Sequence, residues 1–236
     1  MATERGRLFI LATPLGNLKD ISLRALEVLK ESDLIAAEDT RRTLKLLSAS
    51  GFHVPLTSFH ENNKHKKIPG LLARLEQGQN LTLVTDGGTP GISDPGRELV
   101  LAARQAGIPV VPIPGPSALT CALSVSGFSG EAFVFLGFLP RRRSRRKKIL
   151  LEMAGQERTI ILYEAPHRIL SLLKEARETL GNRPAILARE MTKLYEEILS
   201  DNLDGLIQEL TQTPRKGEFT LVLEGSKKAI HLEGTD

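Results

Sequence analysis

The sequence predicts an α/β protein with two domains, the first with a mostly parallel sheet and the second with a mixed sheet. Its 236 residues exceed the roughly 100–200 that are typical of one domain. Its composition, 41% hydrophobic and 25% charged, is that of a globular chain and excludes a disordered or fibrous one. Short runs rich in Ile, Val, Leu and Phe alternate with longer segments of helical periodicity, as in α/β proteins.

In the N-terminal half, a helical pattern separates each short apolar run from the next. We expect strands at residues 7–12, 34–38, 55–59, 81–85 and 109–113, and helices at 21–29, 40–49, 63–76 and 96–105. Such alternation is typical of a parallel sheet. Gly51, Gly78 and Gly107 each follow a helical pattern, where a left-handed cap is common.

In the C-terminal half, some strands follow one another without an intervening helix. We expect strands at residues 132–138, 159–164, 185–190, 194–200 and 218–225, and helices at 167–180 and 203–210. Strands in direct succession favour antiparallel pairing, so this sheet should be mixed. The domain boundary falls within residues 116–130, and we assign domains to residues 1–117 and 118–225, with a tail at 226–236.

Composition also predicts where the protein works. A single cysteine, Cys121, excludes an internal disulfide and suits a reducing cytoplasm. No apolar stretch approaches the roughly 20 residues that span a bilayer, so we expect no membrane partner. The N-terminal residues do not resemble a secretory signal. We therefore expect a cytoplasmic protein.

The net charge of +4 is concentrated in one segment, RRRSRRKK at residues 141–148, which holds seven basic residues and no acidic one. A local basic excess is typical of a surface that binds phosphates, although a run like this can also be a solvated face. We expect a mobile loop and first helical turn that bind RNA through Arg141, Arg142, Arg143, Arg145, Arg146, Lys147 and Lys148.

Three loops that each follow a predicted strand are candidates for ligand contact: ATPLGN, TDGGTPGISDPG and PGPSA, at residues 12–17, 85–96 and 114–118. In an open α/β sheet, ligands collect beyond the carboxyl ends of the strands. The glycines at positions 87, 88, 91 and 96 would let a ligand approach the backbone closely. Ordinary turn formation is the alternative, since the same residue types make turns wherever strands end.

Several familiar sites are excluded by their missing motifs. The sequence has no P-loop and no G-x-G-x-x-G after the first strand. It has five histidines but no H-E-x-x-H or C-x-x-C, so we expect no metal. Acidic residues stand beside basic ones at 37–42, 163–168 and 188–197, either as ion pairs or as the polar wall of a substrate site.

The loop sequences, together with AEDTRRT, SFHENN, FLP before the basic run, YEAPHR, ARE-TK-YEE and KGEFTLVLEG, closely resemble the ribosomal RNA small subunit methyltransferase I family. This is the 16S rRNA cytidine 2'-O-methyltransferase branch of the tetrapyrrole methylase fold. The motifs run in the family's order from about Arg7 to Gly225. YEAPHR together with TDGGTPGISDPG is specific, whereas other methylases of the fold share PGPSA.

The resemblance implies an enzyme that uses S-adenosylmethionine (AdoMet) to methylate a cytidine ribose of 16S rRNA, either free or in the assembled 30S subunit. It also implies a homodimer of subunits with the two-domain tetrapyrrole methylase-like fold. Matched by motif, the cofactor-binding positions are Pro14, Leu15, Gly88, Thr89, Ile92, Ser117, Ala118, Glu164, Ala188 and Gly217.

A ribose hydroxyl is a very weak acid, so a carboxylate or imidazole should help to remove its proton. The candidates for this catalytic role are Glu164, His167, Glu190 and His60. Many relatives continue with a further C-terminal segment, whereas this sequence ends at HLEGTD, so any RNA contact made there would be missing.

Two other functions fit part of the sequence. Methylation of a tetrapyrrole would use the same loops but leaves the basic run unexplained. A non-catalytic RNA-binding factor is the other alternative. With two tyrosines, eight phenylalanines and no tryptophan, however, a base-stacking surface is hard to build.

Overall fold

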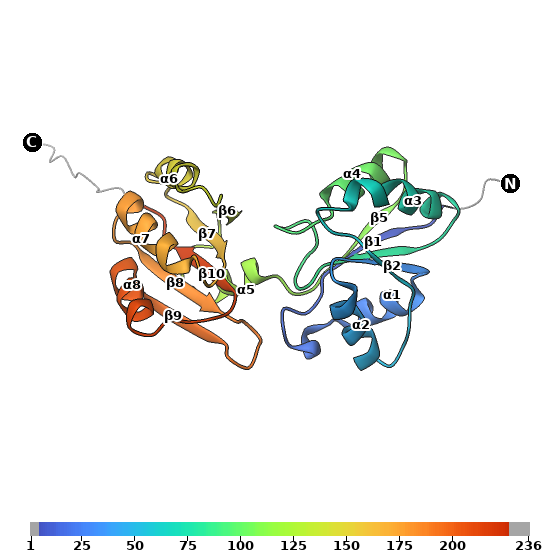
Figure 1. Ribbon diagram of the computed structural model, residues 1–236, viewed down its shortest axis with the longest axis horizontal. Coiled ribbons are helices and arrows are strands. Elements are labelled where there is room, and N and C mark those ends of the chain that lie inside the picture. Colours follow the sequence, from blue (N-terminus) through green and yellow to red (C-terminus); the bar gives the residue numbers. More distant parts are fainter. Residues whose placement is uncertain (1–4, 227–236) are drawn as a thin grey trace, which may run out of the picture. The chain divides into compact units, whose positions relative to one another are not determined.

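The computed structural model describes residues 5–226, which belong to two compact units, Met1–Ser117 and Ala118–Asp236 (Figure 1). All of the predicted tail except Ser226 lies outside the described residues. Within the described part, no helix is both long and apolar enough to cross a membrane.

The first unit is built on a five-stranded, wholly parallel sheet with the order β3-β2-β4-β1-β5. Its strands are β1 (Leu8–Leu11), β2 (Leu34–Ala37), β3 (Leu56–Ser58), β4 (Leu81–Val84) and β5 (Val110–Ile113). Every residue of β2 and β4 is buried, because both strands are paired on two sides and covered on two faces. The prediction of a mostly parallel sheet is confirmed.

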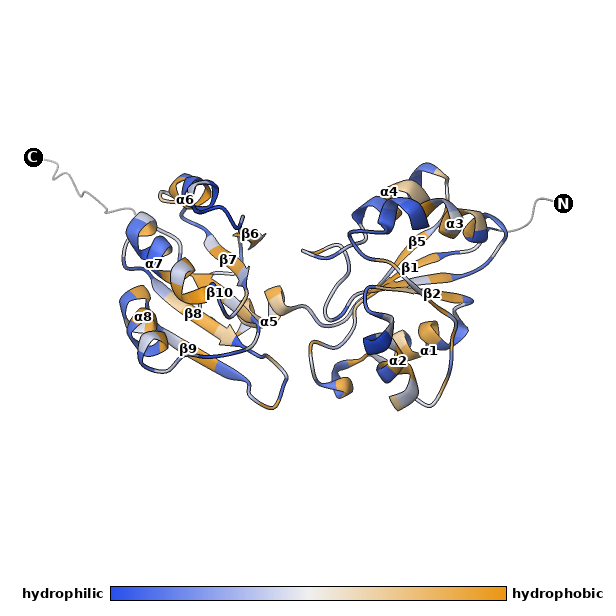
Figure 2. Ribbon diagram, viewed as in Figure 1, coloured by the Kyte–Doolittle hydropathy of each residue, from blue (hydrophilic) through white to orange (hydrophobic). Residues whose placement is uncertain are grey.

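Two pairs of helices cover this sheet, one pair on each face (Figure 1). Helices α1 (Leu23–Glu31) and α2 (Thr40–Ala49) pack on one face, and α3 (Lys64–Glu76) and α4 (Arg97–Gln105) on the other. Figure 2 shows apolar residues along the strands and polar ones on the outer sides of the helices.

The second unit has a mixed sheet with the order β6-β7-β10-β8-β9, as predicted. Its strands are β6 (Phe133–Phe138), β7 (Thr159–Glu164), β8 (Pro184–Arg189), β9 (Glu197–Asn202) and β10 (Phe219–Leu223). Strands β6 and β7 are parallel, and the other neighbours are antiparallel. Helices α6 (Arg143–Glu152), α7 (Ile169–Leu180) and α8 (Leu203–Gln212) cover one face, and the short α5 (Ala118–Ser124) covers the other.

Three local expectations differ from the structure. The basic run was expected to form a mobile loop and a first helical turn; the helix is present, but α6 begins at Arg143 and takes in most of the run. Arg and Lys are good helix formers, and the helix packs onto the sheet through Leu150. The strand expected at 194–200 begins at Glu197 instead, because the residues before it form a turn. The sequence pattern also missed α5 and the 3₁₀ turn η1 (Leu18–Asp20).

The three predicted helix-capping glycines are confirmed. The φ angles of Gly51, Gly78 and Gly107 are 78°, 90° and 68°, in the left-handed region where a Cβ atom is costly.

Candidate functional site

The three predicted ligand loops are hydrogen-bonded to one another in the first unit. Thr13 and Gly88 exchange two backbone hydrogen bonds of 2.9 Å, joining the loop after β1 to the loop after β4. The Thr13 hydroxyl donates to the carbonyl of Thr85 at 3.0 Å. The Thr89 hydroxyl donates to the carbonyl of Pro116, in the loop after β5, at 3.2 Å. The loops thus form one surface beyond the carboxyl ends of three adjacent strands.

Gly88 has a φ of 90°, and a Cβ atom built on it would lie 3.4 Å from the Leu15 side chain. At Gly87, a Cβ atom would lie 3.3 Å from the Pro14 carbonyl oxygen. The structure therefore brings Pro14, Leu15, Gly88 and Thr89 together, while Ile92 lies farther along the same loop and is 39% exposed. Glycine leaves the backbone without a covering side chain, which lets a nucleoside-bearing ligand come close to it, so these residues fit the predicted cofactor.

A small pocket of about 80 Å³ opens at the same edge of the sheet. Ligand pockets usually measure about 300–1,000 Å³, so this one can hold only part of a ligand. It is lined by Thr13, Pro14, Gly16, Leu18, Arg42, Thr43, Leu46, Thr85 and Asp86. Over residues 5–226, no three His, Cys, Asp or Glu side chains are placed to hold a metal ion.

Acidic residues that follow β2 and β4 are hydrogen-bonded to one another beside this pocket. The Asp86 backbone N–H donates to the Glu38 carboxylate at 3.3 Å, and Asp39 donates its backbone N–H to the Asp86 carboxylate at 3.0 Å. Arg42 Nε lies 3.6 Å from Asp86 Oδ2. Burial raises the pKa of Glu38, and the Asp86 charge raises it further, outweighing the Asp86 N–H and the positive charges of Arg42 and His60.

His60, a predicted catalytic candidate, belongs to this side of the first unit. Its Nε2 lies 3.0 Å from Asn63 Nδ2, and its backbone N–H donates to Asn63 Oδ1 at 2.9 Å. These bonds fix the ring close enough for its charge to act on Glu38.

The other three catalytic candidates lie in the second unit and differ in exposure. Glu164, at the end of β7, is buried, and its carboxylate lies 3.1 Å from Arg168 Nη2. His167 is exposed in the turn between β7 and α7. Glu190 accepts hydrogen bonds from Lys193 Nζ at 3.0 Å and from the Glu218 backbone N–H at 2.9 Å.

Glu190 is held as an anion. Burial alone would raise its pKa, but the Glu218 N–H and the Lys193 ammonium outweigh burial and lower it. Gly217, a predicted cofactor position, has a φ of 110°, and any Cβ atom there would overlap the Glu190 side chain. Gly217 thus leaves room for this carboxylate. Ala188, another such position, is buried within β8 opposite Thr220.

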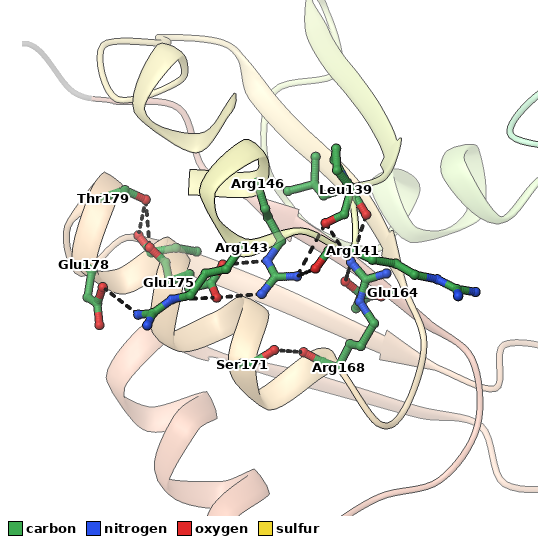
Figure 3. A network of polar contacts seen from close by, with 12 residues as sticks. Leu139, Arg141, Arg143, Arg146, Glu164, Arg168, Ser171, Glu175, Glu178 and Thr179 are labelled. Carbon is green, nitrogen blue, oxygen red and sulfur yellow. Dashed lines mark hydrogen bonds and ion pairs between the residues drawn. The ribbon is translucent and has the colours of Figure 1, made fainter. Parts of the chain in front are cut away.

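The predicted RNA-binding run divides into exposed residues and one buried residue. Arg141, Arg142, Arg143, Arg145, Lys147 and Lys148 are exposed. Arg146 is not, and its predicted RNA contact is wrong. Its guanidinium is buried and bonds both carboxylate oxygens of Glu175, at 2.5 and 2.6 Å (Figure 3). Arg146 faces inward because a helix that packs on a sheet has one side turned toward that sheet, and Arg146 lies on that side of α6.

Two buried or half-buried arginines fasten the turn that precedes α6 (Figure 3). Arg168 Nη2 donates to the carbonyl of Leu139 at 2.8 Å. Arg146 Nη1 donates weakly to the carbonyls of Pro140 and Arg141, at 3.5 and 3.4 Å. Glu164 and Glu175 pair with these two guanidinium groups. The turn carrying the exposed arginines is therefore fixed from beneath.

A family model for tetrapyrrole (corrin/porphyrin) methylases matches residues 7–207. The chain belongs to this family. The loop surface belongs to the first unit of this methylase, and the turn held by Arg146 and Arg168 and the Glu190 carboxylate belong to the second.

Relatives within the methylase family define its branch. The chain is 49% identical over 222 residues to "Ribosomal RNA small subunit methyltransferase I" of Synechocystis sp., covering 94% of this chain and 80% of the relative. It is 46% identical to the protein of the same name from Thermotoga maritima, covering 94% of this chain and 100% of the relative. The predicted membership of the ribosomal RNA small subunit methyltransferase I family is confirmed.

Solved structures of other methylases share the fold. A cobalt precorrin-4 methyltransferase matches with a TM-score of 0.69 at 17% identity, covering 92% of this chain and 94% of that one. Uroporphyrin-III C-methyltransferase from Thermus thermophilus, in complex with S-adenosylhomocysteine, matches with a TM-score of 0.65 at 19% identity, covering 92% and 97%. The predicted tetrapyrrole methylase-like fold is confirmed.

Sequence reasoning missed Glu38, Asp86 and Arg168 as individual site residues. All three lie in segments that it singled out for acids beside bases or for glycines. The sequence does not show which of these residues are in contact, because Glu38 reaches Asp86 only through the pairing of β2 with β4.

We expect Gly88→Val to weaken AdoMet binding at least about tenfold, or about 1.4 kcal/mol. The valine side chain would occupy the loop surface beside Leu15. A non-glycine residue at positive φ also costs about 1–3 kcal/mol in stability. Gly51→Val controls for that strain, because its φ is 78° and no atom lies within 4 Å of its Cβ position. Calorimetric titration with AdoMet measures both variants. Normal binding by Gly88→Val would mean that this loop is not a cofactor site.

We expect Glu175→Ala to lower the free energy of unfolding by about 3–5 kcal/mol, because it leaves the buried Arg146 charge without its partner. Asp204→Ala is the matched control. It removes the acidic partner of an exposed pair with Arg177 and should cost about 1 kcal/mol or less. Urea unfolding measures both losses. Equal losses would contradict the importance of the buried pair.

Proposed function

We propose that this protein transfers a methyl group from AdoMet to the ribose 2'-hydroxyl of a cytidine in 16S rRNA. The observation that carries the proposal is the 49% identity, over 94% of the chain, to a relative named for methylation of small-subunit ribosomal RNA. The bonded loop surface and the exposed basic residues support it, because the reaction needs both a cofactor site and a phosphate-binding surface.

AdoMet, when bound, supplies a methyl group activated by its sulfonium. In the first unit, Pro14, Leu15, Gly88, Thr89, Ile92 and Ser117 hold the cofactor. Gly88 does so by presenting backbone without a side chain. Ala118, Glu164, Ala188 and Gly217 are cofactor positions of the second unit, proposed from their place in the family's motifs.

Glu38, with His60 beside it, is the general base that we favour for the 2'-hydroxyl. A base works best with a pKa near the working pH, and burial moves the pKa of Glu38 in that direction. The pKa of Glu190 moves in the opposite direction. The Glu164 carboxylate is paired with Arg168, and His167 is an exposed alternative.

RNA contacts the exposed residues Arg141, Arg142, Arg143, Arg145, Lys147 and Lys148. The RNA that binds there is 16S rRNA, either free or in the 30S subunit. The protein acts as a homodimer, which sedimentation would test. It acts in the cytoplasm, because its single cysteine, Cys121, suits a reducing compartment.

Offered 30S subunits and a corrinoid precursor side by side, the purified protein should methylate only the RNA. The assay uses radiolabelled AdoMet, and mass spectrometry of the digested 16S rRNA locates the label on a cytidine ribose. The corrinoid arm addresses tetrapyrrole methylation, the activity of the fold's solved relatives. Methylation of the corrinoid alone, or of a base rather than a ribose, would overturn the proposal.

At neutral pH, Glu38→Gln should reduce kcat about 10²–10⁴-fold, the usual contribution of a general base. The wild-type rate should rise with pH as Glu38 loses its proton. Because the pKa of Glu38 is raised, that rise should come at higher pH than for an ordinary carboxyl. The amide variant should lack this rise. Glu31→Gln, an exposed charge change in α1, is the control. If Glu38→Gln keeps the wild-type pH profile, another group is the base.

A further inference from the structure

Phe138, the last residue of β6, presents an aromatic ring to solvent. Its side chain is 56% exposed, the most exposed phenylalanine among the described residues. The ring is nonetheless held, because Tyr163 packs against it with a centroid distance of 5.6 Å and an angle of 60° between the two ring planes. Tyr163 also packs edge-to-face on Phe135 at 4.9 Å, and its hydroxyl accepts a hydrogen bond from the Leu119 backbone at 2.9 Å. Phe138 is thus an exposed ring with a fixed orientation.

A β-bulge aims this ring. Along β6, Phe135 pairs with Ile161 and Gly137 with Leu162, so one extra residue lies between them. Side chains alternate along a strand, so without the bulge Phe138 would face the opposite side from Phe135. With the bulge, Phe138 pairs with Tyr163 and shares the face of Phe135. Gly137 makes this possible with a φ of 58°. Bulges that redirect a side chain are common beside functional sites.

The exposed ring lies next to exposed positive charge. Arg141 follows Phe138 by three residues, so their Cα atoms are at most about 11 Å apart. Leu139 and Pro140 join them, and this is the turn that Arg146 and Arg168 fasten. A fixed aromatic ring beside arginines is the arrangement with which proteins bind unpaired nucleotides, stacking on a base and pairing with its phosphate. The overall scarcity of aromatic residues does not prevent this, since one ring can stack one base.

We propose that Phe138 is a base-stacking residue, which binds an unpaired nucleobase of the RNA whose phosphates contact Arg141 and Arg142. The proposal rests on the RNA substrate of the proposed function and adds a single-stranded binding site to it. Stacking takes place on the face of a ring and releases no counterions, whereas phosphate contacts weaken as salt rises.

The test compares two fluorescently labelled oligoribonucleotides of about 16 nucleotides, one of cytidines and one abasic with the same backbone. Phe138→Ala should weaken binding of the cytidine oligomer about 5- to 150-fold and leave that of the abasic oligomer unchanged. Phe138→Trp, which keeps an aromatic ring at this position, should bind the cytidine oligomer about as tightly as the wild-type protein does. Phe133→Ala is the matched control, since Phe133 lies at the other end of the same strand and is 38% exposed. The double variant Arg141→Ala/Arg142→Ala should weaken both oligomers and reduce the log–log salt slope by about 1.4, which Phe138→Ala should not change.

Equal affinity of the wild-type protein for the two oligomers would overturn the proposal, as would an effect of Phe138→Ala on both. A loss of AdoMet affinity in Phe138→Ala, measured by calorimetry, would also overturn it, because the ring would then contact the cofactor. Methylation of 30S subunits by the wild-type protein is measured separately. If that methylation occurs while Phe138→Ala binds normally, the stacking proposal fails and the proposed function stands.

Discussion

The two backbone hydrogen bonds between Thr13 and Gly88 are the constraint on which the first unit's binding surface depends. They join loops from neighbouring strands, and they can form only because β1 lies directly beside β4 in the sheet. Gly88 needs positive φ to make them, which explains why a glycine stands there. The Thr13 and Thr89 hydroxyls extend the network to Thr85 and Pro116. The loops are consequently ordered before any ligand arrives, which reduces the entropy lost on binding.

Arginine has two opposite uses in the second unit. Arg141 and Arg142 are exposed, whereas Arg146, only a few residues later, is buried against Glu175. The planar guanidinium suits the buried role, because it can bond a carboxylate with two nitrogens and still reach backbone carbonyls with the third. The sequence of the basic run does not show which of its residues are exposed and which is buried. A count of its charges therefore overstates how many of them can contact a phosphate.

Most of the fold could be predicted from the sequence because most of its strands contain short runs rich in apolar residues. The helix at Thr40–Ala49 and the strand at Thr159–Glu164 have the predicted bounds. The failures had physical causes. Residues 118–124 lacked strong periodicity because α5 is only two turns long. The extent of α6 was obscured by its density of charge, so only a first helical turn was expected there. The site was harder, since the meeting of Glu38 with Asp86 depends on pairing between strands more than forty residues apart, and the bulge at Gly137 has no periodic signature.

The place of β1 within its sheet has a consequence for how the chain folds. This first strand is hydrogen-bonded on one side to β4 and on the other to β5, so Leu8 pairs with both Leu81 and Val110. During synthesis, β1 leaves the ribosome long before either partner exists, and the middle of the sheet cannot close until β5 has emerged. Such non-local pairing slows folding. The β8–β9 hairpin of the second unit, whose strands are close in sequence, has no such delay. In the nascent first unit, the apolar strand β1 therefore stays unpaired until β4 and β5 have been made. Helices α1 and α2 are the earliest elements that can cover it.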